Sequence, residues 1–237
     1  LYEDQELALL DTHYYGGVKK YQWVTIPLAL HGVVAKKDGQ MVQVVIGEEE
    51  TDPVFGISDL LIHLSAKQLQ KPAAEVVEGE NLNVLVGSIP LSGEEEEPVK
   101  AQILQILKEK YDMEEDDFLS AEFEVVPAGK ARDYGFDRSM IMGYGHDDRV
   151  CAYPSFEAML AQDKVKYTAV CLLVDKEEIG SVGATGMQSR FFENVTAEVM
   201  HAANQYSELL LRRALKNSMM LSSDVSAGFD PNFPEVM

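Results

Sequence analysis

The stretch that decides the fold is Tyr167-Thr-Ala-Val-Cys-Leu-Leu-Val-Asp175-Lys-Glu177-Glu178-Ile-Gly180-Ser181, where an apolar run ends in three carboxylates. Its length and β-branched content predict a strand covered on both faces, which is typical of a central strand in an α/β sheet. Ligands gather at the carboxyl ends of such strands. Glu177 and Glu178 point in different directions, so one could hold a metal while the other moves a proton. A solvated turn after a strand is the alternative interpretation.

The second half of the chain, residues 119–237, alternates between strand and helix patterns. This alternation indicates the α/β class, with a mostly parallel sheet flanked by helices. The spacing of apolar residues predicts strands at 121–127, 139–142, 167–175 and 219–225, and helices at 147–161 and 189–217.

Residues 1–118 are β-rich instead, which predicts a separate domain. Strands are expected at 24–34 and 41–46, joined by a turn at 37–40, and at 59–64 and 83–89. Residues 97–111 have the apolar spacing of a helix, and the acidic stretch 112–117 is the expected domain boundary.

The composition excludes several classes of function. A formal net charge of -20 argues against a nucleic-acid partner, because phosphate binding needs clustered Lys and Arg. No apolar run reaches the ~20 residues that span a bilayer, so no membrane partner is expected. The two cysteines, Cys151 and Cys171, form no disulfide framework and lie in apolar contexts. They suit small core positions in a reducing, cytoplasmic protein.

Three acidic sites fall at the ends of predicted elements: Asp147-Asp148, Glu177-Glu178 and Asp224. Carboxylates bind divalent cations, and hydrolases with two metals hold the ions about 3.5–4 Å apart. A further carboxylate must carry a proton from water to the leaving group. This pattern suggests Asp147, Glu178 and Asp224 as ligands and Glu177 as the proton carrier, although acidic residues also commonly end strands.

Four segments, taken together and in order, resemble the M18 metalloaminopeptidases. Gly143-Tyr-Gly-His-Asp147-Asp148-Arg149-Val-Cys-Ala-Tyr resembles that family's metal-bridging Asp motif, and Asp175-Lys-Glu177-Glu178-Ile-Gly180-Ser181 resembles its Glu-Glu motif. Ser222-Ser-Asp224-Val, followed by Asp230-Pro-Asn232, resembles its third metal motif. Phe55-Gly-Ile-Ser-Asp-Leu-Leu-Ile-His63-Leu is similar to a segment of the family's inserted domain.

The resemblance implies roles for five residues. Asp147 would bridge two zinc ions, with Glu178 binding one of them and Asp224 the other; cobalt or manganese could substitute. Glu177 would be the general acid and base. His63 would enter the active site of a neighbouring subunit and contact the substrate near the scissile carbonyl.

The resemblance also implies an architecture and an activity. Residues 119–237 would be part of a zinc-exopeptidase-like catalytic domain, and residues 1–118 an inserted β-rich domain for dimerisation and oligomerisation. The protein would remove N-terminal residues from peptide substrates, as a homo-oligomer in which dimers build a larger shell, a dodecamer by family resemblance.

The sequence departs from the family's pattern at three points. Two family His ligands fall before Leu1 and after Met237, and Ala227 stands where the family often has a substrate-contacting His. If the chain were complete, it would therefore be expected to lack two ligands. An inactive assembly protein with the same fold remains one alternative, and a metal-free hydrolase with a carboxylate pair, such as a glycosidase, is another.

Overall fold

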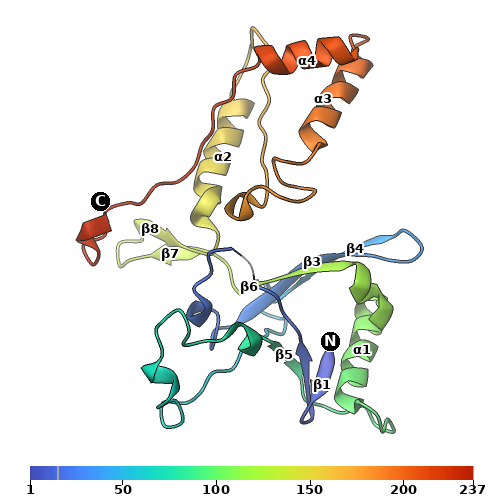
Figure 1. Cartoon of the computed structure of the whole chain (residues 1–237), viewed down its shortest axis with the longest axis vertical. Coiled ribbons are helices and arrows are strands. Elements are labelled where there is room, and N and C mark those ends of the chain that lie inside the picture. The colour runs from blue at the N-terminus through green and yellow to red at the C-terminus, as the bar shows by residue number, and fades with distance from the viewer. Residues whose placement is uncertain (15, 237) are drawn as a thin grey trace. The chain divides into compact units, whose positions relative to one another are not determined.

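The computed structural model describes residues 1–14 and 16–236, which divide into two compact units, Leu1–Met142 and Gly143–Met237 (Figure 1). The predicted boundary at 118–119 lies inside the first unit. Strand β6 (Ala121–Pro127), just beyond that boundary, pairs along its length with β3 (Leu28–Ala35). No helix within the described residues is long and apolar enough to cross a bilayer.

Three small antiparallel sheets and one long helix make up the first unit. The sheets have the strand orders β1-β2-β5, β4-β3-β6 and β7-β8. The remaining bounds are β1 Tyr2–Asp4, β2 Leu7–Leu10, β4 Met41–Ile46, β5 Val84–Gly87, β7 Arg132–Tyr134, β8 Met140–Met142 and α1 Pro98–Tyr111. Short 3-10 turns span Lys20–Gln22, Gln68–Gln70, Gly79–Asn81 and Glu115–Ser120.

The hairpin between β3 and β4 forms at the predicted turn. Gly39 adopts a φ of 87°, which a residue without a Cβ takes at low cost. The amide of Lys36 donates to the carbonyl of Gln40 at 2.8 Å, and Asp38 Oδ1 accepts from the Gln40 amide at 2.9 Å. These bonds fix the register in which Val34 pairs with Val42.

Two apolar clusters form the core of this unit. One gathers the buried residues Val24, Leu28, Ile57, Val77, Leu82 and Val84, and the other gathers Val34, Val44, Ile46 and Met113. Along β4, Val44 and Ile46 face the second cluster while the alternate side chains Met41, Gln43 and Val45 are exposed. Strand β3 is buried or half-buried along its whole length.

The ends of helix α1 are stabilised by residues from elsewhere in the unit. Glu3 Oε2, in β1, accepts hydrogen bonds from the amides of Val99 at 2.8 Å and Lys100 at 3.0 Å. These amides have no partner within the helix, and a carboxylate there also favours the helix dipole. At the other end Asp112 caps the helix in the left-handed region, with a φ of 52°.

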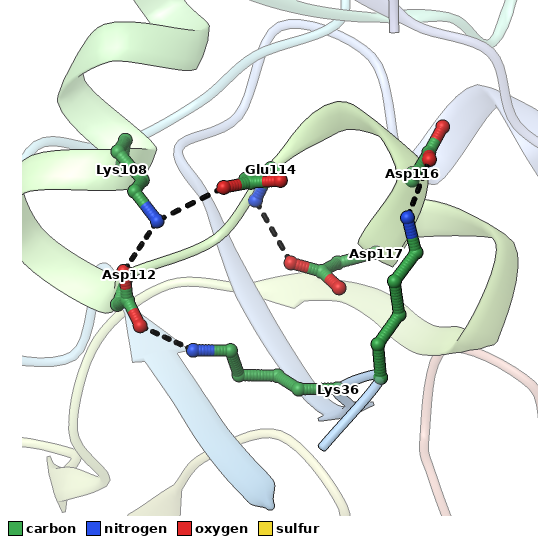
Figure 2. A network of polar contacts seen from close by, with 7 residues as sticks. Lys36, Lys108, Asp112, Glu114, Asp116 and Asp117 are labelled. Atoms are coloured by element: carbon green, nitrogen blue, oxygen red, sulfur yellow. Dashed lines mark hydrogen bonds and ion pairs between the residues drawn. The ribbon is translucent and has the colours of Figure 1, made fainter. Parts of the chain in front are cut away.

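A network of ion pairs joins the end of α1 to the β3–β4 hairpin (Figure 2). Asp112 binds both Lys108 and Lys36, and Lys108 Nζ also lies 3.1 Å from Glu114 Oε1. Lys37 pairs with Asp116 at 2.7 Å. The lysine ammonium groups, Lys108 first and then Lys36, lower the pKa of Asp112 to about 2.

Across residues 143–236, the described part of the second unit, three helices alternate with long segments without regular structure. Its elements are α2 (His146–Leu160), α3 (Phe191–Ala202) and α4 (Glu208–Asn217), with 3-10 turns at Glu177–Ile179 and Pro234–Val236. The single helix predicted at 189–217 is wrong, because it is interrupted between α3 and α4. Asn204 has a φ of 56°, and Ser207 Oγ accepts from the Leu210 amide at 3.2 Å, so a new helix begins there.

Three strand predictions have a different outcome in the structure. Residues 59–64 are exposed, with 59–61 in irregular structure and 62–64 in a turn, so the predicted strand there is wrong. Residues 167–175 and 219–225 have no strand partner among the described residues, and side chains such as Leu173 and Leu221 are exposed. The described sheets are all antiparallel, so the predicted parallel sheet is not confirmed.

We expect Asp112→Asn to lower the urea midpoint of unfolding near pH 7. Because the folded-state pKa of Asp112 is depressed, its stabilising effect is complete above the unfolded pKa near 4 and is lost as pH falls to about 2. The difference from wild type should therefore shrink across that window. Glu95→Gln, in an exposed loop, is the control; an Asp112→Asn midpoint equal to wild type at neutral pH would contradict the expectation.

We expect Gly32→Ala to destabilise the central strand. A Cβ on Gly32 would lie 2.2 Å from Phe123 Cδ1 and 2.5 Å from the Glu122 carbonyl oxygen. Relieving this overlap requires a backbone shift, which costs about 1–3 kcal/mol in the free energy of unfolding. Gly56→Ala, where a Cβ meets nothing within 4 Å, is the matched control in denaturant unfolding.

Candidate metal centre

Asp147 and Asp148 lie at the beginning of α2 in backbone conformations that are not helical. Their φ/ψ values are -83°/109° and -117°/29°, and the peptide between them is cis. Gly145, with a φ of 79°, ends the preceding turn, and Arg149 Nη1 donates to the Tyr144 carbonyl at 3.0 Å. Asp147 and Asp148 therefore lie before the regular part of α2 begins.

Asp224 joins these two residues from a distant part of the sequence. It lies in the irregular segment after α4, where its Oδ1 accepts from the Val225 amide at 2.7 Å. One carboxylate oxygen from each of Asp147, Asp148 and Asp224 lies within 4.8 Å of the others. The structure therefore brings together two of the three predicted metal ligands and adds Asp148.

The chemistry of this cluster fits a divalent cation. Three carboxylates at such separations repel one another unless a cation or protons neutralise them. Oδ1 of the half-buried Asp148 has no hydrogen-bond partner among the described residues, although buried acceptors normally have one. Carboxylate oxygen is a ligand for zinc as well as for harder ions.

Cys151 is a neighbour of the cluster that the sequence did not predict. Its hydrogen bond to Asp148 raises the pKa of the thiol most, burial raises it further, and Ser223 acts in the opposite direction. The apolar context of Cys151 had suggested a core position. Its position three residues after Asp148 in a helix was the available signal, since residues three apart share a face.

Glu177 and Glu178 lie outside the carboxylate cluster, in the exposed 3-10 turn Glu177–Ile179. A compact loop holds this turn. The Ser181 amide donates to the Lys176 carbonyl at 2.8 Å, and the Gln188 amide donates to the Ser181 carbonyl at 3.2 Å. The two adjacent glutamates are thus presented together on one ordered turn.

Asp175 anchors the beginning of the same loop. The Asp175 amide donates to the Thr185 carbonyl at 3.2 Å, and Thr185 Oγ1 donates to Asp175 Oδ2 at 3.2 Å. Burial opposes ionisation of Asp175. The Lys176 amide and ammonium, together with Thr185, outweigh this effect and lower the pKa of Asp175.

A small apolar pocket lies beside the glutamate loop. Its volume is about 180 Å³, and residues 172–174, 184–187, Ser189 and the first two residues of α3, Phe191 and Phe192, line it. The pocket is where the apolar run that precedes Glu177 contacts the rest of the second unit.

His63, the other predicted catalytic residue, belongs to the first unit. It lies in an exposed turn among exposed apolar side chains, including Leu61, Ile62 and Leu64. Its imidazole is therefore available at the surface of that unit.

Comparisons with known proteins agree with these motifs. Residues 2–237 match the family described as Aminopeptidase I zinc metalloprotease (M18). The chain is 66% identical over 238 residues to a probable M18 family aminopeptidase 1 of Clostridium acetobutylicum, covering 100% of this chain and 51% of that protein. It is 46% identical to a probable M18 family aminopeptidase 1 of Thermotoga maritima, covering 100% of this chain and 52% of that protein.

Solved structures show the same likeness. The crystal structure of aminopeptidase I from Clostridium acetobutylicum matches with a TM-score of 0.87 at 62% identity, over 100% of this chain and 51% of that chain. The Thermotoga maritima M18 structure matches with a TM-score of 0.83 at 41% identity, over 99% of this chain and 52% of that chain. The chain spans about half the length of the relatives it matches, and along that whole span it belongs to the M18 family of zinc metalloproteases.

Proposed function

We propose that the full-length protein is a zinc-dependent aminopeptidase that removes N-terminal residues from peptides. The convergence of Asp147, Asp148 and Asp224, whose oxygens lie within 4.8 Å of one another, is the observation that carries this proposal. Such a cluster on an M18 chain is best explained as the carboxylate part of a metal centre.

The proposed centre holds two zinc ions. Asp147, Asp224 and Glu178 would be their protein ligands, and cobalt or manganese could take their place. Asp148 lies beside Asp147 with an unpartnered oxygen, so it either completes the ligand set or orients its neighbours. When bound, zinc supplies a Lewis acid and lowers the pKa of water.

Glu177 is the proposed general base and acid. As a carboxylate it accepts a proton from the attacking water and then returns it to the leaving amine. Its place beside Glu178 on a single 3-10 turn supports this division of labour, because a side chain committed to metal cannot also carry protons. His63 of a neighbouring subunit donates a hydrogen bond to the oxyanion that develops on the scissile carbonyl.

We also propose that the apolar runs at 167–175 and 219–225 become strands of a mostly parallel sheet in the full-length protein. Their exposed side chains, such as Val170 and Leu221, would lose contact with water on pairing. The relatives are about twice as long as this chain, so further strands are available in such proteins. Pairing would place Glu178 at a strand end, where it can join the aspartates.

The first unit is the proposed oligomerisation domain, centred on residues 1–118. The exposed apolar side chains beside His63 support this role, because patches of this kind mark protein–protein contacts. The related S. cerevisiae mApe1 structure, 21% identical, is a dodecamer. We propose a homo-oligomer of dimers, with a dodecamer as the expected form, in a reducing cytoplasmic compartment that suits the two free cysteines.

We expect Glu177→Gln in the full-length protein to lower kcat by about 10²–10⁴-fold while zinc content is unchanged, because only proton transfer is removed. Turnover of aminoacyl chromogenic substrates and elemental analysis measure the two quantities. Glu157→Gln, on the exposed surface of α2, is the matched control. Unchanged turnover in Glu177→Gln would contradict the role of Glu177 as general base and acid.

We expect Asp147→Asn and Asp224→Asn to lose bound zinc. If Asp148 orients the ligands, Asp148→Asn should weaken zinc affinity by about 10–100-fold. Asp163→Asn, an exposed aspartate after α2, should bind zinc as wild type does. Titration with a chelator followed by zinc should abolish and then restore hydrolysis. A protein that holds no zinc would instead be an inactive assembly relative, and activity that survives the chelator would indicate a metal-free hydrolase.

A further inference from the structure

The sheet β4-β3-β6 has two edges of different chemistry. One edge is β6, whose exposed face carries Glu122 and Glu124. The other is β4, with the sequence Met41-Val-Gln-Val-Val-Ile46, which contains neither a charged residue nor a proline. Natural edge strands are usually protected by charge, proline, a bulge or a covering segment. Strand β4 has neither a charged residue nor a proline to protect its edge.

No strand or isolated bridge among the described residues pairs with the outer edge of β4. It pairs only with β3, and the isolated bridges of this unit join Leu28 to Phe55 and Gly56 to Leu85 instead. Strand β5, another uncharged edge, is partly covered by that second bridge, because the Leu85 amide donates to the Gly56 carbonyl at 2.9 Å. Strand β4 is therefore the longest uncharged edge that the described residues leave open.

The solvated face of β4 is apolar as well. Met41 and Val45 are 58% and 54% exposed, and the exposed Gln43 lies between them on the same face. The opposite face is packed, with Val44 and Ile46 in the core. The strand thus offers a free backbone edge together with an apolar stripe beside it, which are the two elements of strand addition.

We propose that β4 pairs antiparallel with β4 of a second copy of this chain, across a two-fold axis that passes near Gln43. The inference rests on the homo-oligomer of the proposed function and names one of its contact surfaces. A two-fold contact brings the same residues together from both copies, so its centre must tolerate self-pairing. An uncharged Gln flanked by apolar residues meets that condition, whereas the glutamates of β6 would repel their own copies.

The charges beyond the two ends of β4 favour the same arrangement. With Gln43 at the axis, Met41 lies opposite the second copy's Val45, and the turn carrying Lys37 approaches the second copy's Glu49. The side chains of Lys37 and Glu49 are 77% and 65% exposed, so each can make a further contact. Lys37 and Glu49 already pair with Asp116 and Lys130 within the chain, and a second copy brings both of these charges to the contact.

Cysteine cross-linking in the full-length protein tests this contact. Gln43→Cys places two thiols on the axis, so mild oxidation should link most of the protein into dimers on non-reducing gels. Mass spectra should then show a disulfide that joins the two introduced thiols, one from each copy. Gln105→Cys, an exposed glutamine on α1, is the matched control. The wild type reports the background from Cys151 and Cys171.

Every outcome of the cross-linking decides the question. Selective linkage through the thiols that Gln43→Cys introduces supports the proposal. If the protein is an oligomer but Gln43→Cys links no better than Gln105→Cys, the β4 contact is overturned while the proposed oligomer stands. A monomeric wild type overturns both, and zinc-dependent hydrolysis, measured on the same samples, reports the proposed activity separately.

A charge at the axis gives an independent measurement. Gln43→Lys sets two lysines opposite each other across the axis, which should weaken dimerisation about fivefold at low salt, with partial recovery at high salt. Sedimentation at several protein concentrations measures the dissociation constant, and Gln105→Lys is the control. Equal dissociation constants for Gln43→Lys and wild type would count against the proposal.

Discussion

Hydrogen bonding along both edges of β3 is the constraint on which the first unit depends. Leu28–Ala35 pairs with β4 on one side and with β6 on the other, so neither neighbour can slip without turning its apolar side chains to solvent. This register directs Val34 and Val44 into the core. The same pairing leaves β4 at the edge of the sheet. The unpaired outer edge of β4 is therefore a consequence of how β3 is paired.

A second constraint, electrostatic rather than geometric, shapes the other unit. Asp147, Asp148 and Asp224 come from two segments separated by two further helices, and their mutual repulsion must be offset for that arrangement to persist. A bound cation is the simplest source of that stabilisation. The proposed metal centre would therefore help to organise this unit as well as supply its chemistry.

Local patterns in the sequence account for much of the fold. The β3–β4 hairpin, β5, α1, β6 and α2 form within a few residues of their predicted bounds, because alternation, helical spacing and turn residues act over short distances. The predictions at 59–64 and 189–217 are wrong for equally local reasons. The run at 59–64 has the apolar composition of a buried strand although its side chains are exposed, and Ser207 begins a new helix inside a continuous helical pattern.

The sequence by itself determined which residues are the candidates for the chemistry, since the motifs around Asp147 and Asp224 single these two out as candidate metal ligands. Only the tertiary structure decided which groups meet. Glu3 at the beginning of α1, Lys36 on Asp112, and Cys151 beside Ser223 are contacts of this kind. Such contacts between distant residues depend on the path of the whole chain, and no local periodicity encodes that path.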